Sequence, residues 1–183
     1  MSKALFILSE LIDRDIDWII TSGNREYISA GTVLIHENEP IAALYILLEG
    51  TLSISVAALG DREINRVTQG EILGEMSFID GRLPSATVTA LEDCFILAIP
   101  RSQLTEKMDQ DVLFSLRFYR AITKFLSSRL RNTNTITPDA QTMPSGQDTS
   151  SPLIDPEATH QLKEQVARFS EVLQRLRDGK SSG

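Results

Sequence analysis

Apolar residues recur at helical spacing near the start of the chain and over a longer stretch in its second half. Residues 4–22 place apolar side chains three or four positions apart, and residues 101–131 repeat this pattern, so both segments are predicted to be amphipathic helices. The apolar positions are Leu8, Leu11, Ile12, Ile16, Ile19 and Ile20 in the first segment, and Val112, Leu113, Leu116, Tyr119, Ile122, Phe125, Leu126 and Leu130 in the second. The region between them has a different pattern, which we interpret as β structure.

From Glu26 onward, short apolar runs alternate with turn residues, which is typical of strands. The predicted strands are Thr32–Ile35, Ala43–Leu48, Thr51–Val56, Glu63–Val67, Ser85–Ala90 and Cys94–Ile99. In Leu52–Val56, apolar residues alternate with serines and predict one solvent-facing side, whereas the apolar run Leu44–Leu48 predicts burial on both faces. Several short strands at regular spacing favour a closed or double-sheet antiparallel architecture. We therefore expect a mainly β fold with flanking helices.

The composition changes again after the second helical segment. Residues 132–155 contain three prolines, many Ser and Thr residues and few large apolar residues, so we predict a disordered linker there. Asp155 is placed as an N-cap and Pro156 as the first helical residue, which predicts a helix over 156–177 and a tail over 178–183. The chain is thus expected to divide into a domain of residues 1–131, a linker, an amphipathic helix and a tail.

The predicted helix at 156–177 carries a heptad seam of apolar residues. Its members follow at steps of four, three, four and three and are Leu162, Val166, Phe169, Leu173 and Leu176. Two heptads alone are marginally stable in water. We therefore expect this face to pair with a copy of itself in a homodimer, to dock on its own domain or to bind another protein.

Charge and cysteine content narrow the class of protein. The 183 residues carry a net charge of −7, which disfavours a general nucleic-acid binder because such binding needs a basic face. The single cysteine, Cys94, precedes an apolar run, so we predict a buried structural thiol in a reducing compartment. No apolar run approaches the length of a membrane span, and we expect a cytoplasmic protein without membrane association.

Five cations lie along residues 117–131 with no acid among them. They are Arg117, Arg120, Lys124, Arg129 and Arg131. We interpret them as a solvated face whose last members suit the negative end of the helix dipole. The alternative is a surface for an acidic partner.

The stretch from Gly74 to Ala90 carries the candidate chemistry. Gly74 and Glu75 precede what reads as the first turn of a short helix, and Pro84 leads into a strand. N–H groups at the start of a helical turn lack intrahelical partners and attract anions. A carboxylate beside them repels phosphate but accepts hydrogen bonds from sugar hydroxyls. The stretch therefore predicts a site for a ligand with one anionic end and one hydroxyl end.

This stretch resembles the phosphate-binding cassette of the cyclic-nucleotide-binding domain family. The resemblance extends over about residues 10–131 and includes the segments Ser29–Ile35, Ala43–Gly50, Gly70–Glu75 and Asp93–Pro100. It implies a jelly-roll-like β-roll with helices before it and a long helix after it. It also implies cAMP or cGMP as the ligand, with no required cofactor and no metal.

The resemblance assigns roles to the residues of the cassette. It places Glu75 as the acceptor of the ribose 2′-hydroxyl, and the backbone N–H groups of Met76 and Ser77 toward the ligand. It also places the strand hydroxyls of Ser85 and Thr87 near the phosphate. The complete set of candidate binding residues is Gly74, Glu75, Met76, Ser77, Arg82, Pro84, Ser85, Ala86 and Thr87.

One residue departs from the family pattern. Pro84 stands where an arginine normally neutralises the cyclic phosphate. A charge-assisted hydrogen bond contributes roughly 1.5–3 kcal/mol, so its loss predicts binding weakened by about ten- to a hundred-fold. Arg82 lies two residues earlier and either turns its guanidinium into the empty place or stays in solvent as a turn residue.

These observations favour a non-enzymatic regulatory or adaptor module, an atypical cyclic nucleotide sensor acting through its C-terminal helices. The alternative is a ligand-free scaffold that dimerises or docks a protein partner. A third interpretation is a relative of transcription regulators, but the sequence leaves no room for a recognition helix, which argues against DNA binding. An enzyme is disfavoured because the two histidines, His36 and His160, cannot form a metal cluster and no nucleophile–base pattern occurs.

Overall fold

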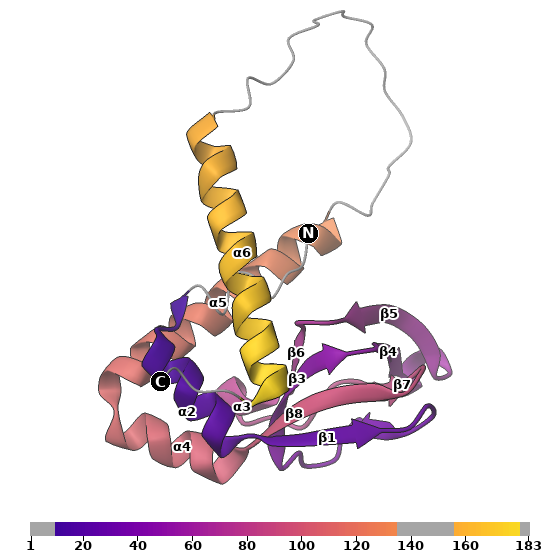
Figure 1. Cartoon of the computed structure of the whole chain (residues 1–183). Helices are drawn as coiled ribbons and strands as arrows, with labels where there is room; N and C mark the ends of the chain where they lie inside the picture. Colours follow the sequence, from indigo (N-terminus) through magenta and orange to yellow (C-terminus); the bar gives the residue numbers. More distant parts are fainter. Residues whose placement is uncertain (1–9, 135–155, 180–183) are drawn as a thin grey trace, which may run out of the picture.

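The computed structural model describes residues 10–134 and 156–179, with side chains at 10–130 and 167–179. It consists of a β-roll with a layer of helices against one of its two sheets (Figure 1). The elements in chain order are α2 (Asp13–Ser22), β1 (Asn24–Ile28), β2 (Val33–Ile35), β3 (Ala43–Glu49), β4 (Thr51–Val56), the 3-10 helix η1 (Ala57–Leu59), β5 (Arg62–Thr68), β6 (Ile72–Leu73), α3 (Glu75–Asp80), β7 (Thr87–Ala90), β8 (Cys94–Pro100), α4 (Arg101–Gln110), α5 (Val112–Asn134) and α6 (Pro156–Asp178).

Two antiparallel four-stranded sheets form the roll, as the sequence predicts. One has the strand order β1-β8-β3-β6 and the other β2-β7-β4-β5. Leu47, Leu52 and Ile96 are fully buried between them. Strand β3 is covered on both faces, because Leu47 packs inside the roll while Leu44 and Ile46 pack against the helices. The predicted two-sided burial of this strand is confirmed.

The predicted solvent-facing side of β4 is only partly correct. Ser53 is 9% exposed, and Ser55 is half-buried. Ser53 pairs with Thr89 of β7 on one side and Arg66 of β5 on the other, so β4 is an interior strand of its sheet. The two neighbouring strands reduce the exposure of Ser53 and Ser55 below what the alternating pattern predicted.

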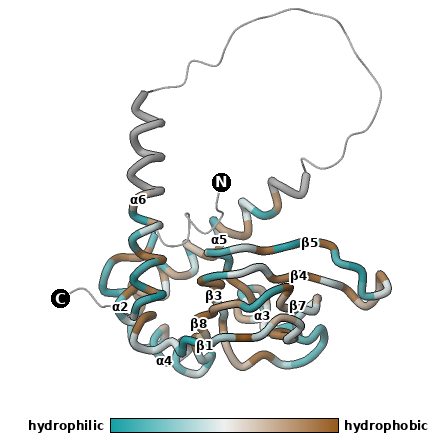
Figure 2. The backbone as a smooth tube through the Cα atoms, turned by 45° about the vertical axis from the view of Figure 1, so that its right-hand side comes forward, coloured by the Kyte–Doolittle hydropathy of each residue, from teal (hydrophilic) through white to brown (hydrophobic). Residues whose placement is uncertain are grey.

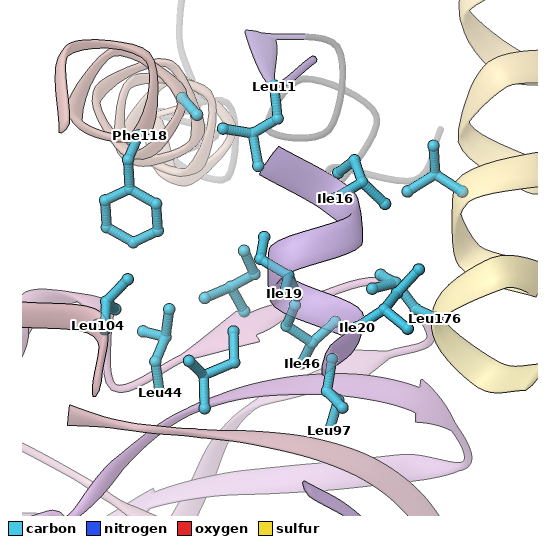
Figure 3. Close-up of a cluster of buried hydrophobic side chains, with 14 of the residues drawn as sticks. Leu11, Ile16, Ile19, Ile20, Leu44, Ile46, Leu97, Leu104, Phe118 and Leu176 are labelled. Atoms are coloured by element: carbon cyan, nitrogen blue, oxygen red, sulfur yellow. The ribbon is translucent and has the colours of Figure 1, made fainter. Parts of the chain in front are cut away.

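A second apolar cluster joins the helices to the outer face of the first sheet. Figure 3 shows how side chains of α2 and the sheet meet those of α4, α5 and α6. The residues labelled there are Leu11, Ile16, Ile19, Ile20, Leu44, Ile46, Leu97, Leu104, Phe118 and Leu176. This cluster fixes α5 against the roll and therefore positions the end of α5 that reaches the candidate site. None of the described helices is long and apolar enough to cross a membrane.

Both predicted flanking helices are interrupted, in each case at an aspartate-based cap. Helix α2 starts at Asp13, where Asp15 accepts the N–H of Ile12 at 3.1 Å. Residues 4–9 of the predicted helix lie outside the described residues. The segment 101–131 divides at Asp111, which accepts the N–H of Phe114 at 2.9 Å. That bond and the ammonium of Lys107 lower the pKa of Asp111. Capping side chains thus begin new helices within a continuous apolar pattern.

The buried face of α5 differs from the predicted one. Ile122 and Phe125 are buried as expected, but Val112, Leu113 and Leu116 are 75%, 64% and 65% exposed. The break at Asp111 changes the rotation of the helix, so the roll is contacted by the residues Phe114, Phe118, Ala121, Ile122 and Phe125. Tyr119 and Leu130 are also exposed, whereas Leu126 packs against the core.

The row of cations on α5 is paired rather than simply solvated, which corrects our interpretation. Arg117 donates two hydrogen bonds to Asp15, at 2.6 and 2.8 Å. Arg120 and Lys124 both pair with Glu10. Arg129 forms an ion pair with Glu75 of the cassette. The side chain of Arg131 is not among those that the structure describes. The acids come from distant segments, so local sequence could not reveal these pairs.

Helix α6 docks on its own domain, the second of the three expected arrangements. Its C-terminal half lies beside α2 (Figure 2), where Arg175 pairs with Asp17 at 2.6 Å. Arg25 of β1 donates to the carbonyl oxygen of Leu176 at 2.7 Å. The buried residues of this half are Phe169, Val172, Leu173 and Leu176. We predicted Phe169, Leu173 and Leu176 as partner-binding residues, but here they contact the chain's own core.

Two further parts of that prediction lie at or beyond the described region. The side chains of Leu162 and Val166 fall outside the described residues. Helix α5 extends to Asn134, so residues 132–134 of the predicted linker are helical, and the rest of that segment is not described.

Candidate functional site

A cavity of about 320 Å³ opens between α3 and the sheet that contains β2, β7 and β4. Helix α3 begins after Gly74 and ends before Gly81, and both glycines have a positive φ. The φ of 85° at Gly74 lies in the left-handed region that favours glycine, whereas a Cβ there would meet chiefly the terminal methyl of the Ile41 side chain. These two turns hold the short helix against the cavity.

Most of the predicted binding residues line this cavity. They are Gly74, Glu75, Met76, Ser77, Arg82, Pro84, Ser85 and Ala86. Thr87 is outside the lining, and its hydroxyl accepts the N–H of Glu37 at 3.2 Å. The Thr87 hydroxyl is thus engaged with the chain's own backbone.

The cavity also has an apolar wall that sequence reasoning missed. Ile35, Ile54 and Val88 form its buried part, while Ile64 and Leu83 are 51% and 50% exposed at its edge. The alternating pattern of β4 indicated that Ile54 has an inward-facing side chain. It could not indicate which other residues share that wall, because the wall is formed by the pairing of strands that are far apart in the sequence. A mostly apolar cavity with a few polar groups is typical of small-molecule sites.

Glu75 is the most buried acid of the cavity, with 3% of its surface exposed. Its Oε1 accepts a hydrogen bond from Arg129 Nη1 at 2.7 Å. Burial raises the pKa of Glu75, and the positive charge of Arg129 acts in the opposite direction. The carboxylate therefore lies in the cavity wall with an ion-pair partner already in place.

Arg129 joins this site from α5, 54 residues along the chain from Glu75. Its side chain is 26% exposed, and its guanidinium lies 5.4 Å from the centroid of the Phe125 ring. Phe125 is fully buried, so the core of the domain sets the position of the arginine. The sequence places Arg129 on the helix, but no local pattern indicates that it lies beside the cassette.

The match to known families agrees with this geometry. A family model described as the cyclic nucleotide-binding domain matches residues 25–111. These residues belong to the cyclic nucleotide-binding domain family.

Relatives of this domain occur in larger proteins. The chain is 27% identical over 120 residues to an uncharacterised NTE family protein of Mycobacterium tuberculosis, covering 66% of this chain and 20% of that protein. It is 27% identical over 128 residues to the cAMP-activated global transcriptional regulator CRP of Pasteurella multocida, covering 67% of this chain and 58% of the regulator. The chain thus spans about a fifth of the first relative and more than half of the second.

A solved structure with the same fold contains a ligand. The regulatory domain of Toxoplasma gondii PKA, crystallised with cAMP, is 27% identical, with a TM-score of 0.52 over 55% of this chain and 39% of that one. The similarity to this structure is a similarity of fold, and in the cyclic nucleotide-binding domain of this chain Pro84 itself lines the cavity.

Arg82 does not fill the place that Pro84 leaves. Its side chain is 85% exposed, and its guanidinium approaches Asp80 at 4.0 Å. Its backbone N–H also donates to Asp80 Oδ1 at 3.0 Å, which ties residue 82 to the turn after α3. Arg82 therefore lies at the rim of the cavity as an exposed turn residue.

Proposed function

We propose that this domain is a regulatory or adaptor module whose cavity binds a cyclic nucleotide, cAMP or cGMP, with low affinity. The observation that carries the proposal is Glu75, a buried carboxylate in the wall of a cavity lined by the cassette residues. Burying a carboxylate is costly unless it is paired; Arg129 supplies that pair and holds the Glu75 carboxylate in the cavity wall, where it can accept a ribose hydroxyl. The cAMP complex of the Toxoplasma relative supports the choice of ligand.

In this proposal each cassette residue has a distinct contact. Glu75 accepts the ribose 2′-hydroxyl, and the backbone N–H groups of Met76 and Ser77 face the phosphate. The Ser85 hydroxyl donates to the same phosphate, and the small side chain of Ala86 leaves room for it. The base packs on the apolar wall around Ile54 and Ile64. Ile64 is 51% exposed, and its side chain is therefore accessible to the base.

Calorimetry with cAMP and cGMP tests this function. The wild-type protein should release or absorb heat with at least one of them, with an affinity about ten- to a hundred-fold below that of a site with the cassette arginine. Glu75→Gln should weaken binding by about tenfold or more, because the amide is a weaker acceptor for the ribose hydroxyl than a carboxylate.

The matched control is Glu92→Gln, which removes an exposed carboxylate from the turn before β8. This variant should bind as the wild type does. No heat with either nucleotide, at protein concentrations that detect millimolar affinity, would rule out the sensor.

An exposed stripe on α5 favours a second candidate function, a scaffold that forms a homodimer. Val112, Leu113, Leu116 and Tyr119 recur at helical spacing and are exposed. An apolar stripe of this kind on a helix is a common protein-contact surface. The scaffold requires no nucleotide, and the existing Glu75–Arg129 pair is compatible with it.

Light scattering distinguishes the scaffold from a monomeric sensor. A dimer that uses this stripe should dissociate on the double change Leu113→Glu and Leu116→Glu, because charges placed in an apolar interface lose their hydration. The control is Thr123→Glu, an exposed position further along α5. A wild-type protein that is monomeric at high micromolar concentration would contradict the scaffold.

The proposal assigns no catalytic step to this domain. Both acids of the cavity, Glu75 and Asp80, are paired with arginines, and we propose a ligand contact for Glu75 alone. A cytoplasmic location is proposed on the single, buried cysteine. The net charge of −7 argues against contact with DNA by this chain.

A further inference from the structure

The cavity contains two arginines in very different settings. Arg82 is at the solvent edge beside Asp80, whereas Arg129 is inside the wall beside Glu75. Their exposed fractions are 85% and 26%. A cation that water screens contributes little to binding an anion, whereas a partly buried one contributes more. Of the two, Arg129 has the setting of a ligand-binding cation.

We infer that Arg129, carried by α5, recognises the anionic group of the ligand and, because Glu75 shares its guanidinium, supplies part of the contribution of the arginine that Pro84 replaces. This inference rests on the proposed function of the cavity. It assigns the charge-recognition step to a helix outside the cassette, whereas the ribose contact stays with Glu75.

The guanidinium is suited to this double role. It presents several N–H donors in a rigid plane, so one edge can stay on the Glu75 carboxylate while another donates to an incoming anion. The Phe125 ring beneath it and the packing of α5 on the core hold that plane in position. An anion bound here therefore meets a cation whose orientation is already fixed, which lowers the entropy lost on binding.

The 2.7 Å contact between Glu75 and Arg129 also limits the ligand. A hydroxyl that donates to Glu75 and an anion that accepts from Arg129 must lie close together on the same molecule. In a 3′,5′-cyclic nucleotide, the phosphorus is joined to the 2′-hydroxyl oxygen through C2′, C3′ and O3′. In a 5′-monophosphate the connection is longer. The pair thus favours a 3′,5′-cyclic phosphate over a 5′-monophosphate.

The same contact links the ligand to α5. A phosphate held by Arg129 and a ribose held by Glu75 tie α5 to α3 through the ligand as well as through the ion pair. Occupancy of the cavity is then expected to fix the end of α5 near Arg129.

Calorimetric titration of the full chain with cAMP, 5′-AMP and adenosine tests the role of Arg129. The measured quantity is the ratio of the adenosine and cAMP dissociation constants, which reports the contribution of the phosphate. The wild type should favour cAMP by about tenfold or more. Arg129→Lys, which keeps the charge but loses the planar donor set, should reduce that ratio several-fold.

Removal of Arg129 alone would leave Glu75 buried without its partner, so a second variant avoids misfolding. The double change Glu75→Gln and Arg129→Met should bring the ratio close to one, whereas Glu75→Gln alone should weaken both ligands and keep the ratio. Arg82→Met is the matched control, because it removes a cation of the same cavity and should leave the ratio unchanged.

Two outcomes would overturn the inference in distinguishable ways. Loss of the phosphate preference in Arg82→Met, with the preference intact in both Arg129 variants, would transfer the role to Arg82 and leave the proposed function standing. A wild-type protein that binds neither cAMP nor cGMP would overturn the proposed function and the inference with it.

Discussion

Replacement of Arg117 by methionine is expected to lower the free energy of unfolding by about 3–5 kcal/mol. Arg117 donates two hydrogen bonds to Asp15, a carboxylate that is 1% exposed. Methionine keeps the packing of the long side chain but leaves the charge of Asp15 inside the protein without a counter-charge. The same pair joins α5 to the start of α2, so its loss also weakens the docking of both helices.

Urea denaturation with Arg120→Met as the control checks this expectation. Arg120 lies on the same helix and pairs with Glu10, but its side chain is 67% exposed, so its replacement should cost less than about 1 kcal/mol. Equal midpoints for the two variants would contradict the assignment of Asp15 as a buried charge that depends on Arg117.

A second large effect is expected for Phe114→Ala, which should cost about 3–5 kcal/mol. Phe114 is fully buried and contacts two aromatic rings, with centroid distances of 5.3 Å to Trp18 and 5.7 Å to Phe118. Its removal opens a cavity at the point where α2, α4 and α5 meet. The neighbouring side chains cannot fill that space, since they are held by the same cluster.

The adjacent residue provides the control for this change. Leu113 is 64% exposed, so Leu113→Ala should alter the free energy of unfolding by less than about 0.5 kcal/mol. Thermal or urea unfolding of both variants measures the contrast. A similar loss for both would mean that the rotation of α5 described above is wrong.

The sequence predicted much of the roll because its strands carry local signals. The strand predicted over residues 51–56 coincides with β4, and those predicted over 43–48 and 94–99 each differ from the observed strand by one residue. Strand β1 was missed, since Asn24–Ile28 is largely polar and exposed and is held by its pairing with β8. Pairing with a distant strand leaves no mark on local hydrophobic pattern.

The cassette shows the same division between local and distant information. Most of its predicted residues line one cavity, because they follow one another along a turn, a short helix and a strand entry. Thr87 was predicted in the site from the family resemblance alone, but its hydroxyl accepts the N–H of Glu37, which lies before β3. The apolar wall depends on β2 and β4, which strand pairing brings to the cassette.

The sequence by itself predicted the class of fold and the position of the cassette, since each depends on neighbouring residues, and it places Pro84 where the family resemblance implies an arginine. Tertiary structure alone decided that Arg129 lies 2.7 Å from Glu75 and that Arg82 points into solvent. It also decided that α6 covers its own domain. The physical reason is that charge pairing and apolar burial act through space between residues that lie far apart in the sequence. Glu75 and Arg129 are 54 positions apart, and α6 is separated from α2 by the whole roll.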